Sequence, residues 1–346
     1  MTCAGVLDNG PVILVLHPSD ELYGADRVLL ETVKALSTHD EVEVWLPTDL
    51  EYARQGLSAE LDRIHIPYAR VDLPVLRRAY ANPRDMAAVS ARAGRFLRLL
   101  AESRPAQIYV NTSALAPAIP IASALGIPST LHVHETWGPT ERRLLGPLCR
   151  PADQIVVVGE ATRSALTENL RRRAVVRRHT VSAPPPDPAA VDGVRGLMSG
   201  IDAPVVLYAG RWTPGKGLAE FLAALRRTDV HLLLLGGPPP SGQTVDVAEE
   251  IARNGLQDRV HVVGEVDEVW PYIYATDAVV VPSTHPESYP TIALEAIAAG
   301  RPVLASDIGG LPEIVTTERG WLITPGDTEA WAAHLGALES TSGLQQ

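Results

Sequence analysis

Two carboxylates at a fixed spacing are the first residues in this sequence that could do chemistry. Glu287 and Glu295 enclose the segment ESYPTIALE, in which we expect a helix to begin near Pro290 or Thr291. Proline fits the first turn of a helix, because its missing N–H would have no partner there. The free amides of Thr291 and Ile292 therefore predict an anion site, and Glu295, about one turn further on, could reach hydroxyls of the same ligand. Taken in isolation, the two carboxylates fit a surface acid and a solvated helix residue better.

A glycine-rich loop with two cations follows another apolar run. Residues 208–217 read YAGRWTPGKG, so that Arg211 and Lys216 stand between a strand and a helix. The loop matches G-x-x-x-x-G-K, but a P-loop needs Ser or Thr next to hold Mg²⁺, and Gly217 stands there instead. Binding of a diphosphate by the cation pair is the better interpretation. Surface cations at a helix start are the alternative, which the helix dipole disfavours.

Two weaker signals come from the first half of the chain. The segment LHVHETW ends a strand, and the alternation of strand residues places His132 and His134 on one face. A zinc pair would need further ligands, and no third one is evident nearby in the sequence, so we favour a polar His134 at the strand end over a zinc site. A hydrogen-bonded strand histidine is the alternative. Gly24, in the turn after the first strand, could let backbone amides approach a ligand or could simply serve a tight turn.

The elements that must position these residues are short apolar strands alternating with amphipathic helices. We expect strands at residues 12–17, 42–46, 107–111, 129–134, 154–159, 204–209, 230–235, 260–263, 278–281, 302–305 and 321–323. We expect helices at residues 23–36, 86–100, 114–124, 161–170, 218–225, 245–252, 292–299 and 330–338. This alternation predicts α/β domains with parallel sheets covered on both faces. A proline-rich linker at residues 183–188 predicts two doubly wound domains, 1–184 and 185–346, with ligands at the carboxyl ends of the strands and in the cleft between the domains.

Composition narrows the class of protein. The 346 residues are 46% hydrophobic and 21% charged, which is typical of globular domains. Two cysteines exclude a disulfide framework, and neither a secretory signal nor an apolar run long enough to span a membrane is evident, so we expect a cytoplasmic protein. The formal net charge of −11 argues against nucleic acid as a partner. Residues 1–186 carry 21 Lys and Arg against 20 Asp and Glu, whereas residues 187–346 carry 9 against 21.

Together, these segments resemble the retaining glycosyltransferases of the GT-B fold, in particular glycosyltransferase family 4. The resemblance covers nearly the whole chain and is strongest over residues 204–325. It rests on the E-x7-E motif from Glu287 to Glu295, on AGR at 209–211 with KGL at 216–218, and on ASDIGGLPE at 305–313.

The resemblance implies two Rossmann-like domains that face a cleft, with the acceptor side in residues 1–184 and the donor side in residues 185–346. It implies transfer of a sugar from a UDP- or GDP-sugar to a glycan, lipid-linked or small-molecule acceptor in polysaccharide biosynthesis, with no metal or other cofactor.

The resemblance also implies roles for single residues. Arg211 and Lys216 would bind the donor diphosphate, helped by Gly24 and by the amides of Thr291 and Ile292. Glu295 would bind the ribose, and residues from Gly264 to Val266 would lie near the base. Glu287 and His134 would lie at the donor sugar as the catalytic residues.

The sequence departs from the family pattern in three places. Tyr289-Pro290 replaces the commoner Phe-Gly, and Tyr23-Gly24 replaces a Gly-Gly turn. The chain also ends soon after Leu338, where such folds usually return a helix to the first domain, so we expect either looser closure or a longer natural chain.

Three further expectations stay open. A catalytically silent nucleotide-sugar or partner-binding protein and a sugar-nucleotide epimerase are the alternative functions on this fold. Arginine clusters at 142–150 and 171–178 also suggest peripheral contact with the inner face of the cell membrane if the acceptor is lipid-linked.

Overall fold

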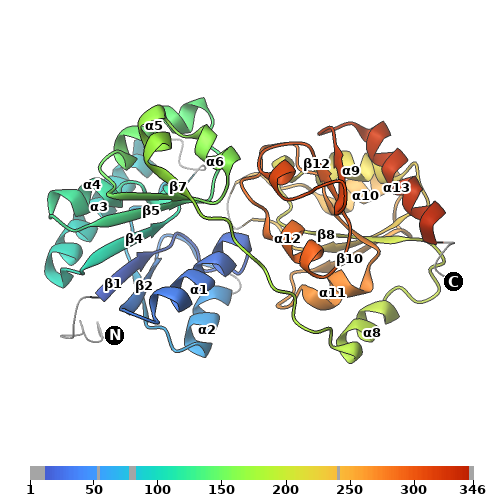
Figure 1. The fold of residues 1–346 in the computed structure, drawn as a ribbon, viewed down its shortest axis with the longest axis horizontal. Coiled ribbons are helices and arrows are strands. Elements are labelled where there is room, and N and C mark those ends of the chain that lie inside the picture. Colours follow the sequence, from blue (N-terminus) through green and yellow to red (C-terminus); the bar gives the residue numbers. More distant parts are fainter. Residues whose placement is uncertain (1–11, 53–54, 78–82, 240–241, 343–346) are drawn as a thin grey trace. The chain divides into compact units, whose positions relative to one another are not determined.

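The computed structural model describes residues 12–52, 55–77, 83–239 and 242–342, and the chain divides into two compact units, Met1–Arg178 and His179–Gln346. Each unit is built around its own parallel sheet, so the prediction of two α/β domains is confirmed (Figure 1). The sequence placed the boundary at residues 184 and 185, whereas the proline-rich segment lies wholly in the second unit. This segment leads into helix α8 (Pro188–Gly196), where the carboxylate of Asp187 accepts the amide hydrogen of Ala189 at 3.0 Å.

Within the described residues, the first unit holds a seven-stranded parallel sheet in the order β3-β2-β1-β4-β5-β6-β7. Its strands are β1 (Val12–Leu16), β2 (Glu41–Pro47), β3 (Tyr68–Val71), β4 (Gln107–Asn111), β5 (Ser129–Val133), β6 (Gln154–Val157) and β7 (Ala174–Val176). Its helices are α1 (Gly24–Leu36), α2 (Gly56–Arg63), α3 (Pro83–Ser103), η1 (Ser113–Leu115), α4 (Ala118–Ala124), α5 (Pro139–Cys149), α6 (Glu160–Ala165) and α7 (Glu168–Arg173). Figure 1 shows α1 and α2 on one face of the sheet and α3, α4 and α5 on the other.

Both faces of this sheet are buried, because successive strand residues point to opposite sides. Ile13 and Val15 belong to one core cluster with Leu29 of α1. Leu14 belongs to the other, with Phe96 of α3. Burial on both faces explains why the central strands read as unbroken apolar runs.

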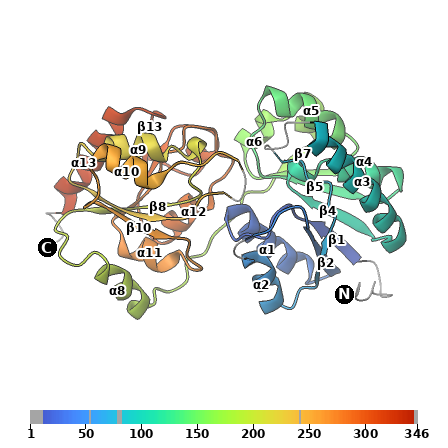
Figure 2. The same cartoon turned by 180° about the vertical axis from the view of Figure 1, so that it is seen from behind.

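The second unit, over the residues described, has a six-stranded parallel sheet in the order β10-β9-β8-β11-β12-β13. Its strands are β8 (Val205–Ala209), β9 (His231–Leu235), β10 (Val260–Gly264), β11 (Ala278–Val281), β12 (Val303–Ser306) and β13 (Gly320–Ile323). Besides α8, its helices are η2 (Pro214–Lys216), α9 (Leu218–Leu225), α10 (Val247–Asn254), α11 (Trp270–Ala275), α12 (Thr291–Ala298), η3 (Leu311–Glu313) and α13 (Thr328–Ser342). Figure 2 shows α9, α10 and α13 on one face of the sheet and α11 and α12 on the other. Phe221 of α9 and Trp331 of α13 pack edge to face, with ring centroids 5.5 Å apart.

Two of the predicted helices are wrong as single helices. The helix expected over residues 114–124 is interrupted after η1, because Pro117 has no N–H to continue a helical hydrogen-bond ladder and instead stands before α4. The helix expected over residues 161–170 divides into α6 and α7 at Leu166 and Thr167, both of which have extended backbone.

Eight elements of the described residues were not predicted, and most of them are short. Two are the outermost strands of the first sheet, β3 and β7, which are four and three residues long and do not need the long apolar run of a central strand. The others are helices α2, α5, α8 and α11 and the single-turn helices η2 and η3.

Candidate functional site

The strand order of each sheet reverses at one point on its carboxyl edge, which we call the switch point. In the second unit the chain moves outward from β8 to β9 and β10, then returns to the other side of β8 with β11. The loops after β8 and β11 therefore leave in opposite directions and open a crevice at the strand ends, where doubly wound folds bind ligands. Strands β1 and β4 define the same point in the first unit.

The predicted cation loop and the first carboxylate of the E-x7-E motif meet at the β8/β11 point. Lys216, at the end of η2, places its Nζ 2.6 Å from Oε1 of Glu287, which lies in the loop after β11. The hydroxyl of Ser283 donates to the same oxygen at 2.5 Å. The side chains of Lys216 and Glu287 are 36% and 15% exposed, so this ion pair is partly shielded from water and remains accessible.

Arg211 lies earlier in the same loop, and its backbone is held in place. Its carbonyl oxygen accepts hydrogen bonds from the hydroxyl of Tyr208 at 3.1 Å and from the amide of Thr213 at 3.0 Å. The side chain is half-buried. The β8 loop thus presents both predicted cations from a fixed backbone.

Glycines allow the loops to touch at this point. Gly217 has a φ of 69°, and a Cβ there would lie 1.9 Å from the carbonyl oxygen of Pro282. In the turn after β12, a Cβ on Gly310 would lie 1.8 Å from the carbonyl oxygen of Ser288. The amide of Gly310 also donates to the carbonyl oxygen of Glu287 at 2.7 Å. The backbone around Glu287 is therefore contacted closely from two loops, at positions where only glycine fits.

Helix α12 begins at Thr291, as the sequence predicts, with Pro290 as its N-cap. Thr291 and Ile292 are its first two residues, whose amides have no carbonyl partner inside the helix. Glu295 is 7% exposed, so the interpretation of this carboxylate as a solvated helix residue is wrong. Glu295 is therefore a buried carboxylate about one turn into the helix.

The residues expected near the base lie two strands away. Gly264 ends β10, has a φ of 90° and accepts the amide hydrogen of Gly236 at 2.8 Å; Val266 follows it in the loop. Gly236 in turn approaches the β8 loop, because a Cβ there would lie 2.0 Å from the carbonyl oxygen of Gly210. A row of close backbone contacts thus runs along the carboxyl edge from β8 to β10.

In the first unit, the predicted His134 stands at one end of a hydrogen-bond network, and the helical turn that contains the predicted Gly24 stands at the other. Gly24 is the first residue of α1, and Asp26 in the same turn contacts His17, which follows β1. His17 contacts Asn111 at the end of β4, and the Asn111 amide oxygen lies 2.9 Å from Nε2 of His134. The ring centroids of His132, in β5, and His134, directly after it, lie 4.0 Å apart, so the two side chains point to the same side, as the alternation of strand residues predicts.

The residues just beyond Asn111 are held under strain. Thr112 has a φ of 139°, a region that non-glycine residues rarely occupy. Oε2 of Glu135 accepts hydrogen bonds from the hydroxyl of Ser113 at 2.7 Å and from its amide at 3.3 Å, and this holds the strained turn. Burial raises the pKa of Glu135, although the bonds from Ser113 oppose that shift.

Sequence reasoning missed Ser283, His17, Asp26 and Asn111. His17 and Asn111 are polar residues at the ends of apolar strands, a signal that becomes useful only when β1 and β4 are known to be neighbours.

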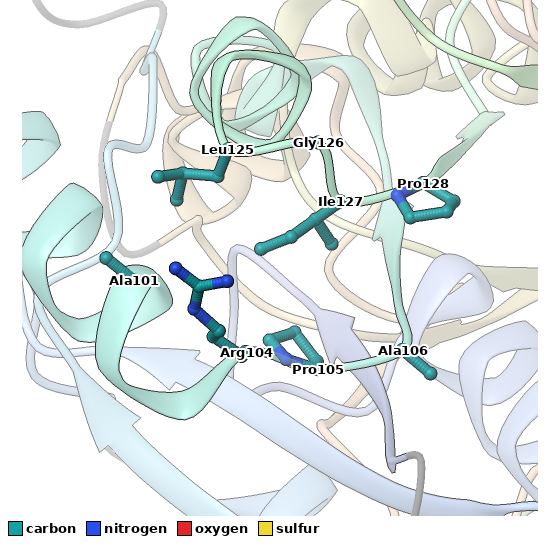
Figure 3. Close-up of a pocket in the computed structure, with 8 residues that line it drawn as sticks. All are labelled: Ala101, Arg104, Pro105, Ala106, Leu125, Gly126, Ile127 and Pro128. Carbon is teal, nitrogen blue, oxygen red and sulfur yellow. The ribbon is translucent and has the colours of Figure 1, made fainter.

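A cavity of about 240 Å³ in the first unit does not belong to this site (Figure 3). Its lining includes Pro105 and Ala106, which precede β4, and Ile127 and Pro128, which precede β5. It therefore lies at the amino-terminal edge of the sheet, whereas His17, Asn111 and His134 lie at the carboxyl edge.

No helix in the described part of the chain combines the length and the apolar character needed to cross a membrane.

Comparison with known proteins agrees with this architecture. The model of "Glycosyltransferase Family 4" matches residues 23–183, and that of "Glycosyl transferases group 1" matches residues 203–340. A D-inositol 3-phosphate glycosyltransferase of Xylanimonas cellulosilytica is 38% identical over 149 residues, covering 41% of this chain and 36% of that protein. The enzyme of the same name from Saccharomonospora viridis is 33% identical over 228 residues, covering 56% of this chain and 51% of that protein. The chain thus spans about half the length of these relatives, or less.

Among solved structures, HepE of Anabaena in complex with UDP and glucose superposes with a TM-score of 0.79 at 22% identity, covering 96% of this chain and 90% of that one. Two parallel-sheet α/β units with a cation–carboxylate site at a switch point define a protein of the GT-B class. The two family models together match most of the chain, and it belongs to glycosyltransferase family 4.

The close approach at Gly217 makes a prediction about stability. Gly217→Ala should lower the free energy of unfolding by at least about 2 kcal/mol, because the new methyl group meets the Pro282 carbonyl at an unfavourable φ. Urea unfolding measures the change. Gly193→Ala in α8 is the matched control, since a Cβ there meets nothing within 4 Å; it should be neutral or stabilising by about 0.5–1 kcal/mol. Equal effects of the two substitutions would show that the contact at Gly217 is not constrained.

Proposed function

We propose that this protein is a retaining glycosyltransferase that moves a sugar from a UDP- or GDP-sugar to a glycan, lipid-linked or small-molecule acceptor. The observation that carries the proposal is the meeting of the Arg211–Lys216 loop, Glu287 and the start of α12 at one switch point. The names of the relatives and the UDP and glucose bound to HepE support a nucleotide-sugar donor.

The electrostatics of the site suit departure of a diphosphate. Negative charge grows on the diphosphate as the bond to the sugar breaks, and fixed cations and amides stabilise that charge more in the transition state than before it. Arg211, Lys216 and the amides at the start of α12 would supply this stabilisation. Glu287 would orient the sugar and favour positive charge at its anomeric carbon.

The Lys216–Glu287 pair gives the two residues linked roles. Without donor, the carboxylate holds the ammonium group in place between the β8 and β11 loops. With donor bound, Lys216 would share its charge between Glu287 and the diphosphate. Glu295 would take the ribose hydroxyls, and the Gly264–Val266 loop would lie near the base.

Two alternatives lead to different results. A catalytically silent protein would bind a nucleotide sugar without turnover, and an epimerase would change the sugar without any acceptor. The ion pair and the clamped backbone of Glu287 favour an enzyme, because binding a nucleotide does not require so constrained a carboxylate.

The ion pair predicts that substitutions at its two positions do not add. Lys216→Ala should reduce catalytic efficiency by ~30- to 1000-fold and weaken UDP binding, because it removes a phosphate partner and leaves Glu287 uncompensated beside the diphosphate. Glu287→Gln should leave UDP affinity within a few-fold while turnover collapses. In the double variant, UDP should bind more tightly than to Lys216→Ala alone. Calorimetric titration of UDP and turnover rates for all four proteins complete the cycle. Strictly additive effects on UDP binding, or normal turnover by Glu287→Gln, would contradict these roles.

Catalysis should need no divalent metal, because Arg211 and Lys216 can neutralise the diphosphate and the sequence has no Asp-x-Asp at a strand end. The donor is first chosen from a panel of nucleotide sugars by thermal stabilisation, which reaches ~2.7 kcal/mol at 100 times the dissociation constant. Transfer in excess chelator should then stay close to normal. A loss of transfer that Mg²⁺ or Mn²⁺ restores would overturn this part of the proposal.

We also propose that the first unit docks on anionic lipid to reach a lipid-linked acceptor. Arg173 donates to the carbonyl oxygen of Arg150 at 2.9 Å, which brings the end of α7 against the end of α5. The two arginine clusters therefore meet at this contact, and along the chain they flank two exposed apolar side chains, Leu144 at 63% and Val175 at 56%. Basic residues around exposed apolar groups fit the surface of an anionic bilayer, at ~1 kcal/mol for each charge near the surface.

Co-sedimentation with phosphatidylserine vesicles tests this docking. Binding should be present at low salt, fall at high salt, and weaken for Leu144→Glu. Leu197→Glu, at a position 56% exposed in the acidic second unit, is the matched control and should bind like the unmodified protein. Absence of binding at low salt, or an equal loss for both variants, would reject the proposed surface.

A further inference from the structure

Four polar side chains form a continuous chain at the β1/β4 switch point of the first unit. Asp26, His17 and Asn111 are 2%, 1% and 0% exposed, and His134 lies at the end of the chain, partly exposed. Buried polar groups destabilise a fold unless they are hydrogen-bonded, so a buried chain of three must be fully matched in donors and acceptors.

With the Asn111 amide oriented as in the structure and both rings neutral, donor–acceptor matching places the protons. Nδ2 of Asn111 can only donate, and it lies 3.0 Å from Nδ1 of His17, which must therefore accept. The proton of a neutral His17 then sits on Nε2, which is 2.6 Å from Oδ1 of Asp26. Oδ1 of Asn111 can only accept, so Nε2 of His134, 2.9 Å away, must donate. In a neutral ring the lone pair of His134 is then on Nδ1.

The far end of the chain is anchored by α1. Oδ2 of Asp26 accepts the amide hydrogen of Tyr23 at 2.8 Å, and its Oδ1 accepts from the hydroxyl of Ser19 at 2.6 Å. The carboxylate is thus held from the helix start and from the loop after β1. A fixed carboxylate favours the Nε2-protonated form of His17. The Asn111 amide, which donates to Nδ1 of this form, then has its oxygen directed at Nε2 of His134.

At the other end of the chain, the strained turn at Thr112 fixes the position of the neighbouring Asn111. The hydrogen bonds from Ser113 to Glu135 and from Nε1 of Trp137 to the hydroxyl of Ser113, at 3.1 Å, hold this turn directly after Asn111. Strain of this kind persists where the surroundings over-determine the backbone, and such places cluster at functional sites. The Asn111 amide is therefore held in one place relative to β5.

We propose that Asp26, His17 and Asn111 are positioning residues that hold His134 in a single neutral tautomer, with Nε2 donating to the protein and Nδ1 accepting from a hydroxyl of the sugar substrate. The proposal rests on the proposed function, in which His134 faces the donor sugar.

A neutral His134 suits the charge changes of the reaction. Positive charge grows at the anomeric carbon in a glycosyl transition state, and an imidazolium close by would oppose it. A carboxamide partner does not favour the imidazolium, whereas a carboxylate in its place would. Asn111 therefore orients the ring of His134 without favouring its protonated form.

Histidine side-chain ¹⁵N NMR of the unmodified protein tests the tautomer directly. With His134→Gln and His17→Gln used for assignment, both rings should show a protonated Nε2 and an unprotonated Nδ1. A proton on Nδ1 of His134, which the reverse orientation of the Asn111 amide would require, overturns the proposal, and so does the averaged signal of a freely exchanging ring. This measurement does not depend on activity, so it decides the tautomer even if no nucleotide sugar is turned over and the proposed function fails.

Kinetics of Asn111→Asp test the consequence. This isosteric change should convert His134 to the imidazolium in the NMR spectrum and reduce kcat by about 10- to 100-fold. The Kd for UDP, which lacks the sugar, should stay within two-fold of normal. Asn254→Asp in α10 repeats the same chemical change away from the site, since the Asn254 amide donates to the Glu250 carbonyl of its own helix, and it should leave kcat unchanged. An unchanged kcat for Asn111→Asp together with an imidazolium signal would show that the charge of His134 does not matter to the reaction.

Discussion

The single reversal of strand order in each parallel sheet is the constraint on which both halves of the site depend. All strand carboxyl ends lie at one edge, but only between β1 and β4, and between β8 and β11, do adjacent loops leave in opposite directions. The polar side chains described above gather at these two points. The same constraint brings backbone from separate loops into contact, and this is why Gly217, Gly236 and Gly310 have no room for a side chain.

In the second unit, the cations at the proposed site are placed together although the unit as a whole has a negative net charge. Residues 187–346 carry 9 Lys and Arg against 21 Asp and Glu, yet two cations and the start of α12 gather at the β8/β11 point. The attraction that matters for a diphosphate acts over a few ångströms in a partly shielded site, where fixed groups need not reorganise. Glu287 fits this arrangement because Lys216 and Ser283 already hold its charge.

The two units organise their polar groups differently. In the second unit the cations and the first carboxylate stay accessible, as expected for groups that must exchange partners with a ligand. In the first unit the polar chain from Asp26 to Asn111 is buried and internally matched, and only His134 at its end is partly exposed. Buried networks of this kind give orientation rather than charge, because each donor is held against an acceptor away from water.

The sequence by itself determined the α/β class, the central strands, the cation loop and the start of α12, because each depends on neighbouring residues: apolar periodicity, glycine and proline placement, and free helix amides. The break at Pro117 also has a local cause, the missing N–H of proline, which our prediction overlooked. The break at Thr167, the edge strands β3 and β7 and the burial of Glu295 depend instead on what packs against them. Only the tertiary structure decided that Lys216 pairs with Glu287 across 71 positions of sequence, and that His17 meets Asn111 across 94. Such contacts follow from strand order, and strand order is settled by the packing of whole helices on both faces of a sheet rather than by any local pattern.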